Sequence, residues 1–418
     1  MSSKKNWMPW FPCAGRAFFT LLLALCPGCG AVIAADLAIV GAKVYASPDA
    51  APLADAVVLI KAGEIVAVGS RERTPVPKGF ETIDARGGVL VAGLWNCHIH
   101  LVRDGLLTPE GLSDENLSTT LQRMFVQWGF TTVFDLASTM KSANAIRERI
   151  RAGSVSGPRI LTVGEPFYPP GGTPVYAKPI YEQEHLPSAE IKNAAQAVDR
   201  VDIQVKEGAD GIKLFTAAIQ GAGAPPRYMA ARDVRAITAE AHRLGRYTLA
   251  HPTDAEGVNL AIDNGVDILA HVDPLAGPWS PRFVAKLKAR NIGLIPTLML
   301  FDVYPDARTP IEVGIQQVAA LAKAGGDVLF GTDAGFMEVY DPTQEYLLMG
   351  RAMSWQAILS SLTTTPARRF GLGERLGRVK VGFLADLTLL DGDPASGVAA
   401  FAHVRAVYRS GESIYSKR

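Results

Sequence analysis

Cysteine is scarce in this 418-residue chain, and its four cysteines are unevenly placed. Cys13, Cys26 and Cys29 fall within the first 30 residues, so Cys97 is the one cysteine in the rest of the sequence. That part has no pair from which an intramolecular disulfide could form, which excludes a disulfide-stabilised scaffold. On a strand, Cys97 would face away from its neighbour His98, so we expect it to pack in a core rather than to bind a metal.

The chain also lacks an excess of charge of either sign. Its 42 Lys and Arg residues balance 41 Asp and Glu residues, which leaves a formal net charge of +1. This balance gives no reason to expect nucleic acid or an anionic surface as a partner. Hydrophobic residues make up 48% of the chain and charged residues 20%, which is typical of a globular protein with a large core.

The first long apolar stretch is too short to cross a bilayer. It covers residues 17–25 and follows Lys4, Lys5 and Arg16, whereas the first acidic residue is Asp36. A basic start followed by a short apolar core is typical of a secretory signal peptide rather than of a membrane anchor.

Small residues before Asp36 provide a cleavage site, so we predict a signal peptide over residues 1–35, cleaved near Ala34 or Ala35. The mature chain would be exported to the periplasm or secreted, with no membrane span. Lipid anchoring through Cys26 or Cys29 is the alternative, but the residues before each of them fit that signal poorly.

Short β-strand patterns occur near both ends of the remaining chain. We predict that residues 36–92 and 376–418 together form one small β-sandwich domain. The expected strands lie at residues 37–45, 56–61, 65–69, 385–390 and 404–411.

Residues 93–375 instead alternate short apolar strands with helical stretches such as 231–244 and 281–290, which favours parallel βα units. Eight units predict an α/β fold, a (β/α)8 TIM barrel with its active site at the carboxyl ends of the strands. A doubly wound sheet is the alternative, but no glycine-rich phosphate fingerprint follows the first strand. The expected strands are 95–100, 131–136, 159–163, 211–215, 247–251, 267–271, 292–296 and 328–333.

Four of the seven histidines fall at or just after expected strand ends, and these are His98, His100, His251 and His271. His98 and His100 are two residues apart, so on a strand both imidazoles point to one face and can hold a divalent metal ion. The alternative is a pair of polar residues at a strand end. Asp333 lies at the end of the eighth strand and would bring a carboxylate to the same edge.

Lys213 lies inside the fourth strand of the predicted barrel. A buried ammonium group is costly and repels a metal ion. A neutral amine can instead react with carbon dioxide to give a carbamate, an anionic group whose two oxygens can bridge two metals. The alternative is a lysine that reaches solvent or pairs with an acid.

One connection, residues 164–187, is rich in Pro, Gly and Tyr and shows little helical or strand pattern. It follows the third strand, so we expect it to cover the barrel mouth, with a plain surface insertion as the alternative. The candidate substrate-binding residues combine its aromatic side chains with two that follow the fourth strand: Tyr168, Tyr176, Tyr181, Arg227 and Tyr228.

Eight short motifs in this order resemble the amidohydrolase superfamily, specifically its imidazolonepropionase-like and prolidase-like branch. The resemblance implies a barrel flanked by a β-sandwich and a centre of two divalent metal ions, usually zinc. The matching segments are 93–100 (GLWNCHIH), 129–135 (GFTTVFD), 211–215 (GIKLF), 249–251 (LAH), 266–271 (VDILAH), 331–335 (GTDAG), 364–368 (TTPAR) and 376–387 (LGRVKVGFLADL).

By the matching positions, His98 and His100 would hold the first metal together with Asp333, and the second metal would have two histidines from later strands. Carboxylated Lys213 and a hydroxide would bridge the two ions, because two cations depress the pKa of a shared water. Asp333 would take the proton of the hydroxide and pass it to the leaving nitrogen. The complete implied set is His98, His100, Lys213, His251, His271 and Asp333.

The resemblance implies hydrolysis of an amide or peptide-like bond in a small molecule. Aromatic walls with one arginine suit a dipeptide or an N-acyl amino acid. A lactonase or esterase, a deaminase with one metal, and an inactive binding protein are the alternatives. Deaminases of this superfamily commonly have a glutamate where this chain has Asp254, and they lack the bridging lysine, which favours the two-metal hydrolase. A homo-oligomer is an open alternative to a monomer, because an interface cannot be identified from a single sequence.

Overall fold

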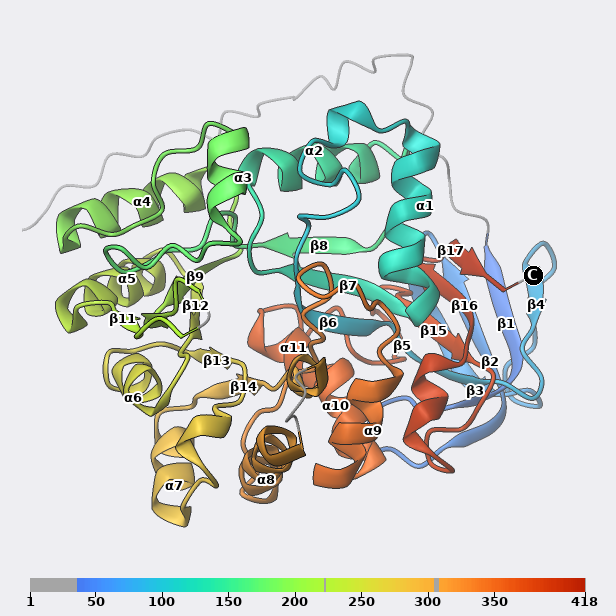
Figure 1. Ribbon diagram of the computed structural model, residues 1–418. Coiled ribbons are helices and arrows are strands. Elements are labelled where there is room, and N and C mark those ends of the chain that lie inside the picture. Colours follow the sequence, from blue (N-terminus) through green and yellow to red (C-terminus); the bar gives the residue numbers. More distant parts are fainter. Residues whose placement is uncertain (1–35, 222, 304–307, 418) are drawn as a thin grey trace, which may run out of the picture. The chain divides into compact units, whose positions relative to one another are not determined.

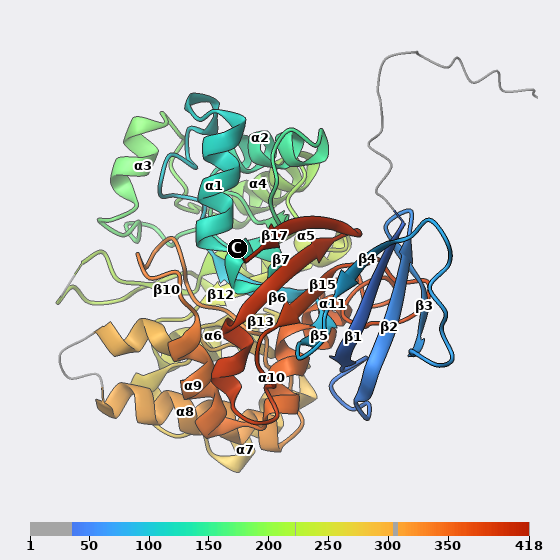
Figure 2. The ribbon, with the colours of Figure 1, turned by 90° about the vertical axis from the view of Figure 1, so that its right-hand side faces the viewer.

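Strands from the two ends of the chain form a single eight-stranded sheet (Figures 1 and 2). The computed structural model describes residues 36–221, 223–303 and 308–417, so the predicted signal peptide lies outside the described residues. The order is β17-β16-β15-β5-β1-β2-β3, and β4 also pairs with β1. The strands are β1 (Leu37–Val44), β2 (Leu53–Lys61), β3 (Glu64–Ser70), β4 (Glu81–Asp84), β5 (Val89–Ala92), β15 (Leu387–Leu390), β16 (Val404–Arg409) and β17 (Glu412–Ser416).

Strand β1 pairs with two different strands along the same edge, and its backbone is irregular between the two pairings. Residues 37–40 run parallel to β4, whereas residues 43–44 run parallel to β5. Gly41 lies between the two sets with φ +93°, where a side chain would meet Arg86. The sequence predicts a sandwich of the two chain ends, and the ends do combine. Hydrogen bonds connect their strands in one continuous sheet. Strand β1 pairs with β2 on one side and with β5 on the other, and β5 pairs with β15 from the C-terminal end.

Two parallel sheets follow, and their strands lie at the places that the sequence predicts. The first has the order β6-β7-β8 and the second the order β14-β13-β12-β9. Nearly all of their residues are buried, as expected for parallel strands covered on both faces. The strands are β6 (Leu94–Ile99), β7 (Phe130–Asp135), β8 (Arg159–Thr162), β9 (Gly211–Phe215), β12 (Tyr247–His251), β13 (Ile268–Ala270) and β14 (Gly293–Ile295).

The expected eighth strand, residues 328–333, differs from the prediction, because it makes only single bridges and isolated hydrogen bonds. Val328 forms a parallel bridge with Leu294 of β14, and Phe330 accepts a hydrogen bond of 2.7 Å from Cys97 of β6. Asp333 has φ +60°, a left-handed conformation that a regular strand excludes. The segment therefore reaches both sheets without continuing a ladder.

Helices cover the parallel sheets (Figure 1). Several begin with a side chain that accepts a hydrogen bond from an amide of the first turn, as Ser113, Thr139 and Asn193 do. The helices are α1 (Asp114–Met124), α2 (Met140–Arg151), α3 (Lys178–Gln183), α4 (Ala194–Lys206), α5 (Ala231–Arg243), α6 (Ala255–Asp263), α7 (Pro281–Ala289), α8 (Arg308–Lys323), α9 (Thr343–Ala352), α10 (Trp355–Leu362) and α11 (Thr364–Arg369).

The long connection after β8 is more structured than its composition predicts, because it contains the short helix α3. A two-stranded ribbon of β10 (Ala217–Ala218) and β11 (Arg227–Tyr228) follows β9. Within the described ranges, no helix has both the length and the apolar character needed to span a bilayer.

Candidate metal centre

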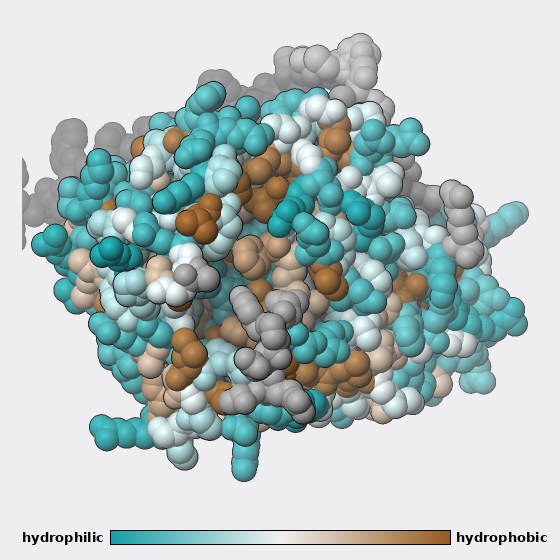
Figure 3. Space-filling model, viewed as in Figure 1, coloured by the Kyte–Doolittle hydropathy of each residue, from teal (hydrophilic) through white to brown (hydrophobic). Residues whose placement is uncertain are grey.

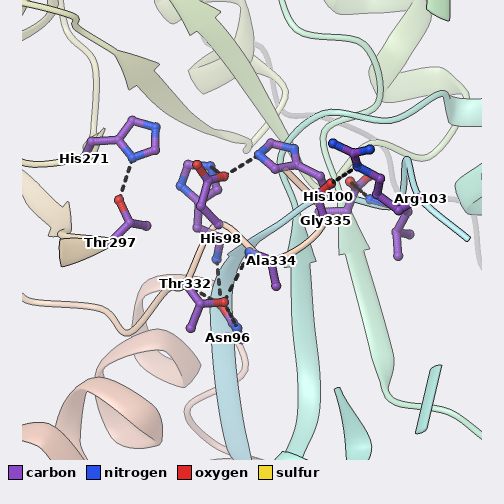
Figure 4. Close-up of polar contacts among 12 residues, drawn as sticks. Asn96, His98, His100, Arg103, His271, Thr297, Thr332, Ala334 and Gly335 are labelled. Atoms are coloured by element: carbon purple, nitrogen blue, oxygen red, sulfur yellow. Dashed lines mark hydrogen bonds and ion pairs between the residues drawn. The ribbon is translucent and has the colours of Figure 1, made fainter. Parts of the chain in front are cut away.

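Histidines from several strand ends lie close together, three of them labelled in Figure 4, and two of them contact Asp333. His98 lies in β6, His251 ends β12, and His271 directly follows β13. The ring centres of His98 and His271 are 4.6 Å apart, and those of His251 and His271 are 4.8 Å apart. In Figure 4, His98 lies between His271 and His100. Parallel strands that end at one edge therefore bring these side chains together, as their positions in the sequence predict.

Asp333 is the acidic member of this cluster and contacts two histidines. Its Oδ1 lies 2.7 Å from Nε2 of His100 and 3.2 Å from Nε2 of His98. Burial alone would raise the pKa of Asp333, but the two histidines outweigh it and hold the pKa well below its usual value. The carboxyl group is therefore ionised at neutral pH.

His98 is buried, and neither of its ring nitrogens has a hydrogen-bond partner among the described residues. Burial lowers its pKa to about 3, and the charge of Lys213 acts in the same direction. Its Nε2 meets only the carboxylate of Asp333 at 3.2 Å and its Nδ1 has no polar partner in the described part of the chain, and such a buried imidazole is costly unless it binds something. Ligand atoms of His98, His271 and Asp333 lie within 4.8 Å of one another, so these residues fit a divalent metal ion.

The tautomer of His271 follows from its contact with Thr297. His271 Nδ1 lies 2.6 Å from Thr297 Oγ1, whose own proton is donated to the carbonyl oxygen of Pro296 at 2.9 Å. With its proton donated to Pro296, the hydroxyl oxygen can accept from His271, and this assignment places the ring proton on Nδ1 and leaves Nε2 as the lone-pair atom. This is the arrangement in which an outer partner orients a metal-binding histidine.

The backbone of the cluster adopts unusual conformations. His271, Thr297 and Asp333 have φ values of +115°, +44° and +60°, in the region that favours glycine. Such strain persists only where surrounding contacts over-determine it, and it concentrates at functional sites. Gly335 has φ +98°, and a Cβ there would meet the carbonyl oxygen of His100, so this close approach requires glycine.

Lys213 is 2% exposed, which excludes the alternative of a lysine that reaches solvent. Burial lowers its pKa to about 7, although the charge of Asp333 acts to raise it. A substantial fraction of the amine is then neutral near pH 7. The sequence-based alternative of a pairing acid finds no support in the described ion pairs, none of which includes Lys213.

His251 stacks on Phe215, with ring centres 4.4 Å apart and an angle of 22° between the planes. Desolvation lowers its pKa to about 3, and the charge of Lys213 adds to this effect. Phe215 lies two residues beyond Lys213 in β9, so both point to the same face. The structure thus places His251 in the same electrostatic neighbourhood as Lys213 and Asp333.

The expected substrate residues lie in different environments. Tyr168 is buried and packs against Phe215, with ring centres 4.7 Å apart. The hydroxyl of Tyr181 is buried and has no hydrogen-bond partner among the described residues. Tyr176 is exposed and contacts Phe336 at 5.1 Å between ring centres.

The other two candidates lie on the outer ribbon that follows β9. Arg227 is exposed, and Tyr228 donates a hydrogen bond of 2.6 Å from its hydroxyl to Asp254. Tyr168 and Tyr181 of the long connection pack together, with ring centres 6.4 Å apart, whereas Arg227 and Tyr228 lie on the exposed ribbon, so the five candidates do not form one cluster.

Sequence reasoning missed several residues that support the cluster. Asn96 donates a hydrogen bond of 2.8 Å to the hydroxyl of Thr332, and this hydroxyl accepts one from the amide of Ala334 (Figure 4). These contacts fix the segment around Asp333. Thr297 was missed as well. A signal existed for two of them, because Asn96 precedes His98 by two residues and Thr297 directly follows the seventh strand.

Comparisons with known proteins agree with this arrangement. The family model "Amidohydrolase family" matches residues 89–414. An ochratoxinase from Aspergillus niger is 24% identical over 89% of this chain and 85% of its own length. A 5-methylthioadenosine/S-adenosylhomocysteine deaminase from Syntrophobacter fumaroxidans is 25% identical over 85% of each chain. The crystal structure of a Xaa-Pro dipeptidase with bound methionine covers 91% of this chain and 100% of its own, with a TM-score of 0.75 and 20% identity.

The matched span includes β5, every strand of the two parallel sheets, β15, β16 and most of β17. The likeness to the dipeptidase structure concerns the fold alone. The chain therefore belongs to the amidohydrolase family, whose members are generally metal-dependent hydrolases that act on carbon–nitrogen bonds.

Proposed function

We propose that this protein hydrolyses an amide or peptide-like bond of a small molecule at a centre of two divalent metal ions, with zinc as the expected metal. The observation that supports this most directly is the buried ring of His98, whose nitrogens form no hydrogen bond with the described residues and whose Nε2 lies 3.2 Å from ionised Asp333. They provide neutral and anionic donors at one point, as a divalent cation requires.

We propose that the parallel segments close into an eight-membered (β/α)8 barrel. Single contacts support closure at both gaps between the two sheets. Phe167, beyond β8, forms a parallel bridge with Leu214 of β9. On the other side, residues 328–334 bridge to β14 and to β6, where Ile99 pairs with Ala334. The boundaries at residues 92/93 and 375/376 remain a prediction.

The proposed ligand set combines the cluster with Lys213. His98, His100 and Asp333 would hold one metal, and His251 and His271 the other, with carboxylated Lys213 between them. Divalent ions bound there would acidify water and polarise the scissile carbonyl. The low pKa of Lys213 favours the neutral amine that carboxylation requires. Asp333, anionic and in contact with His98 and His100, is placed to accept a proton and return it to the leaving nitrogen.

For the substrate, we propose an amide with an apolar or aromatic part, such as a dipeptide or an N-acyl amino acid. Figure 3 shows apolar surface near the centre of one face, surrounded by hydrophilic residues. Phe336 lies three residues after Asp333 and contacts Tyr176 of the long connection, which brings aromatic rings near the cluster. Arg227 would bind a carboxylate of such a substrate, although its side chain is exposed on the ribbon β10–β11.

A deaminase is the second candidate, because one curated relative of similar identity has that activity. Asp254, which occupies the position of the deaminase glutamate, is already engaged. It caps α6 by accepting from the amide of Gly257 at 2.9 Å, and it also accepts from Tyr228. These contacts, together with buried Lys213, favour hydrolysis of an amide over deamination.

The test is a screen of zinc-loaded residues 36–418, prepared with bicarbonate, against dipeptides, N-acyl amino acids, cyclic amides, lactones and esters. We expect released amine from a related group of amides, about two metals per chain, and loss of activity by at least about 100-fold in Asp333→Asn. Ammonia release from aminopurines would favour the deaminase. Hydrolysis of lactones alone would move the activity to carbon–oxygen bonds, and a chain that binds no metal would overturn the proposal.

We also propose that the protein is exported after cleavage near Ala34 or Ala35. Cell fractionation and mass measurement of the mature chain test this. A mature mass that begins near Asp36 supports export, whereas a lipid-modified Cys26 or Cys29 would indicate an anchored form.

A further inference from the structure

Glu345 is a fully buried acid that the proposed mechanism does not use. It lies in the first turn of α9 and is 0% exposed. One carboxyl oxygen accepts a hydrogen bond of 3.0 Å from the amide of Leu298, and the other accepts one of 2.7 Å from the amide of Met299. No arginine or lysine among the described ion pairs accompanies it. Burying an acid without a cation is costly, so the presence of Glu345 at this position needs an explanation.

Those two amides belong to the turn that follows β14 and begins with Thr297. A threonine with φ +44° is strongly disfavoured, because its branched side chain crowds the backbone in that region. Bonds to the next two amides are the means by which Glu345 holds this turn in place. With the backbone held, the Thr297 hydroxyl meets both Pro296 and Nδ1 of His271.

We propose that Glu345 is a positioning residue for the metal centre: through the turn at residues 297–299 it presents Thr297 to His271 and so fixes the ring with Nε2 free for a metal. The inference rests on the proposed function. It adds to that function a connection from helix α9 to His271: two hydrogen bonds join Glu345 to residues 298 and 299, the backbone continues to Thr297, and a hydrogen bond of 2.6 Å joins Thr297 to His271. The side chains that hold a metal-binding histidine commonly control metal affinity.

The alternative is that Glu345 only stabilises the fold, so the test needs a readout that stability does not move. We would measure metals per chain by elemental analysis, metal affinity by competition with a chelator, and the melting temperature of the same samples. The variants are Glu345→Gln, Thr297→Val and Thr297→Ser. Asp386→Asn is the control for a loss of stability alone, since Asp386 is also buried and accepts from the backbone amide of Ser410, but it pairs with Arg159 and lies beside β15.

We expect Glu345→Gln and Thr297→Val to bind one of the two metals at least about tenfold more weakly, while Thr297→Ser, which keeps the hydroxyl, binds both as the wild type does. Asp386→Asn should melt earlier and keep both metals. If Glu345→Gln does not fold, Glu345→Asp replaces it, because the shorter side chain cannot reach both amides.

Wild-type affinity for both metals in the folded Glu345 variant, whatever its melting temperature, overturns the inference. Wild-type affinity in Thr297→Val would break the link to His271 and overturn it as well. A wild-type protein that binds no metal would instead refute the proposed function, so the two failures are distinguishable.

Discussion

The burial of Lys213 costs stability, and a chemical role in the site would explain it. It lies inside β9 at 2% exposure, and its pKa is lowered to about 7. An apolar side chain of similar length would fill the same space without the cost of desolvating an amine. The lysine is therefore a poor choice for stability and a good one for a site that needs a reactive amine beside Asp333.

We accordingly predict that Lys213→Met separates stability from metal binding. Without metal, this variant should melt at or above the wild-type temperature, because no amine is buried. With zinc and bicarbonate it should bind at most about one metal per chain and lose activity. Calorimetry and elemental analysis of the same samples check both statements. Two metals bound to this variant would contradict the bridging role.

At the scale of elements, the approach of the segment after Phe330 to β6 depends on a glycine. Gly335 has φ +98° and no room for a Cβ against the carbonyl oxygen of His100. His100 in turn donates its backbone amide to Ala334 at 2.8 Å. Any shift of this segment therefore moves His100 and Asp333 together.

Gly335→Ala should destabilise the protein by more than about 2 kcal/mol, because steric overlap adds to the backbone strain at positive φ. Gly382→Ala provides the control: Gly382 has φ +85°, but a Cβ there would meet nothing within 4 Å, so it reports the strain alone at about 1 kcal/mol. Denaturant unfolding measures both. Zinc content should fall only in Gly335→Ala, and equal losses of stability in the two variants would argue against the close contact.

Helix α9 adds a pH dependence through Glu345. Burial raises the pKa of Glu345 to about 8, although the amides of Met299 and Leu298 act to lower it. The folded protein then holds a proton that the unfolded chain releases near pH 4.5. Between these two values stability is lost as the pH rises, with a slope of at most about 1.4 kcal/mol per pH unit from this group.

The prediction is tested by urea unfolding of the metal-free protein at several pH values from about 5 to 8. Glu345→Gln cannot titrate, so the wild type should lose stability relative to this variant as the pH increases. A difference that stays constant, or one of opposite sign, would show that Glu345 is ionised throughout this range.

At the scale of the whole molecule, a mostly buried ion pair joins the eight-stranded sheet to the parallel strands. Arg159 begins β8, and its guanidinium lies 2.6 Å from Asp386, just before β15. Asp386 is 4% exposed and also accepts a bond from Ser410. The pair links parts of the chain that are 227 residues apart.

Arg159→Met should lower the free energy of unfolding by about 2 kcal/mol, since Asp386 keeps its burial and loses its cation. Arg351→Met is the control, because Arg351 and Glu312 are both half exposed and their pair should contribute less than about 1 kcal/mol. Thermal unfolding compares the two. Equal, small losses would show that water replaces the lost arginine at the junction.

The order of strands and the positions of His98, His100, His251, His271 and Asp333 at their ends were predictable from the sequence. Their signal is local: short apolar runs each stop at a polar residue, and parallel strands bring such ends to one edge. The burial of Lys213 followed for the same reason, since it lies within such a run.

The contacts that set the chemistry were decided only by the tertiary structure. Thr297 reaches His271, and Glu345 reaches the turn after Thr297, through a backbone at positive φ that no local pattern encodes. Likewise the last segment of the predicted barrel makes single bridges rather than a strand. Local hydrophobic pattern determines which residues form strands, whereas hydrogen bonds between distant segments depend on how those strands pack, and packing is a property of the folded chain as a whole.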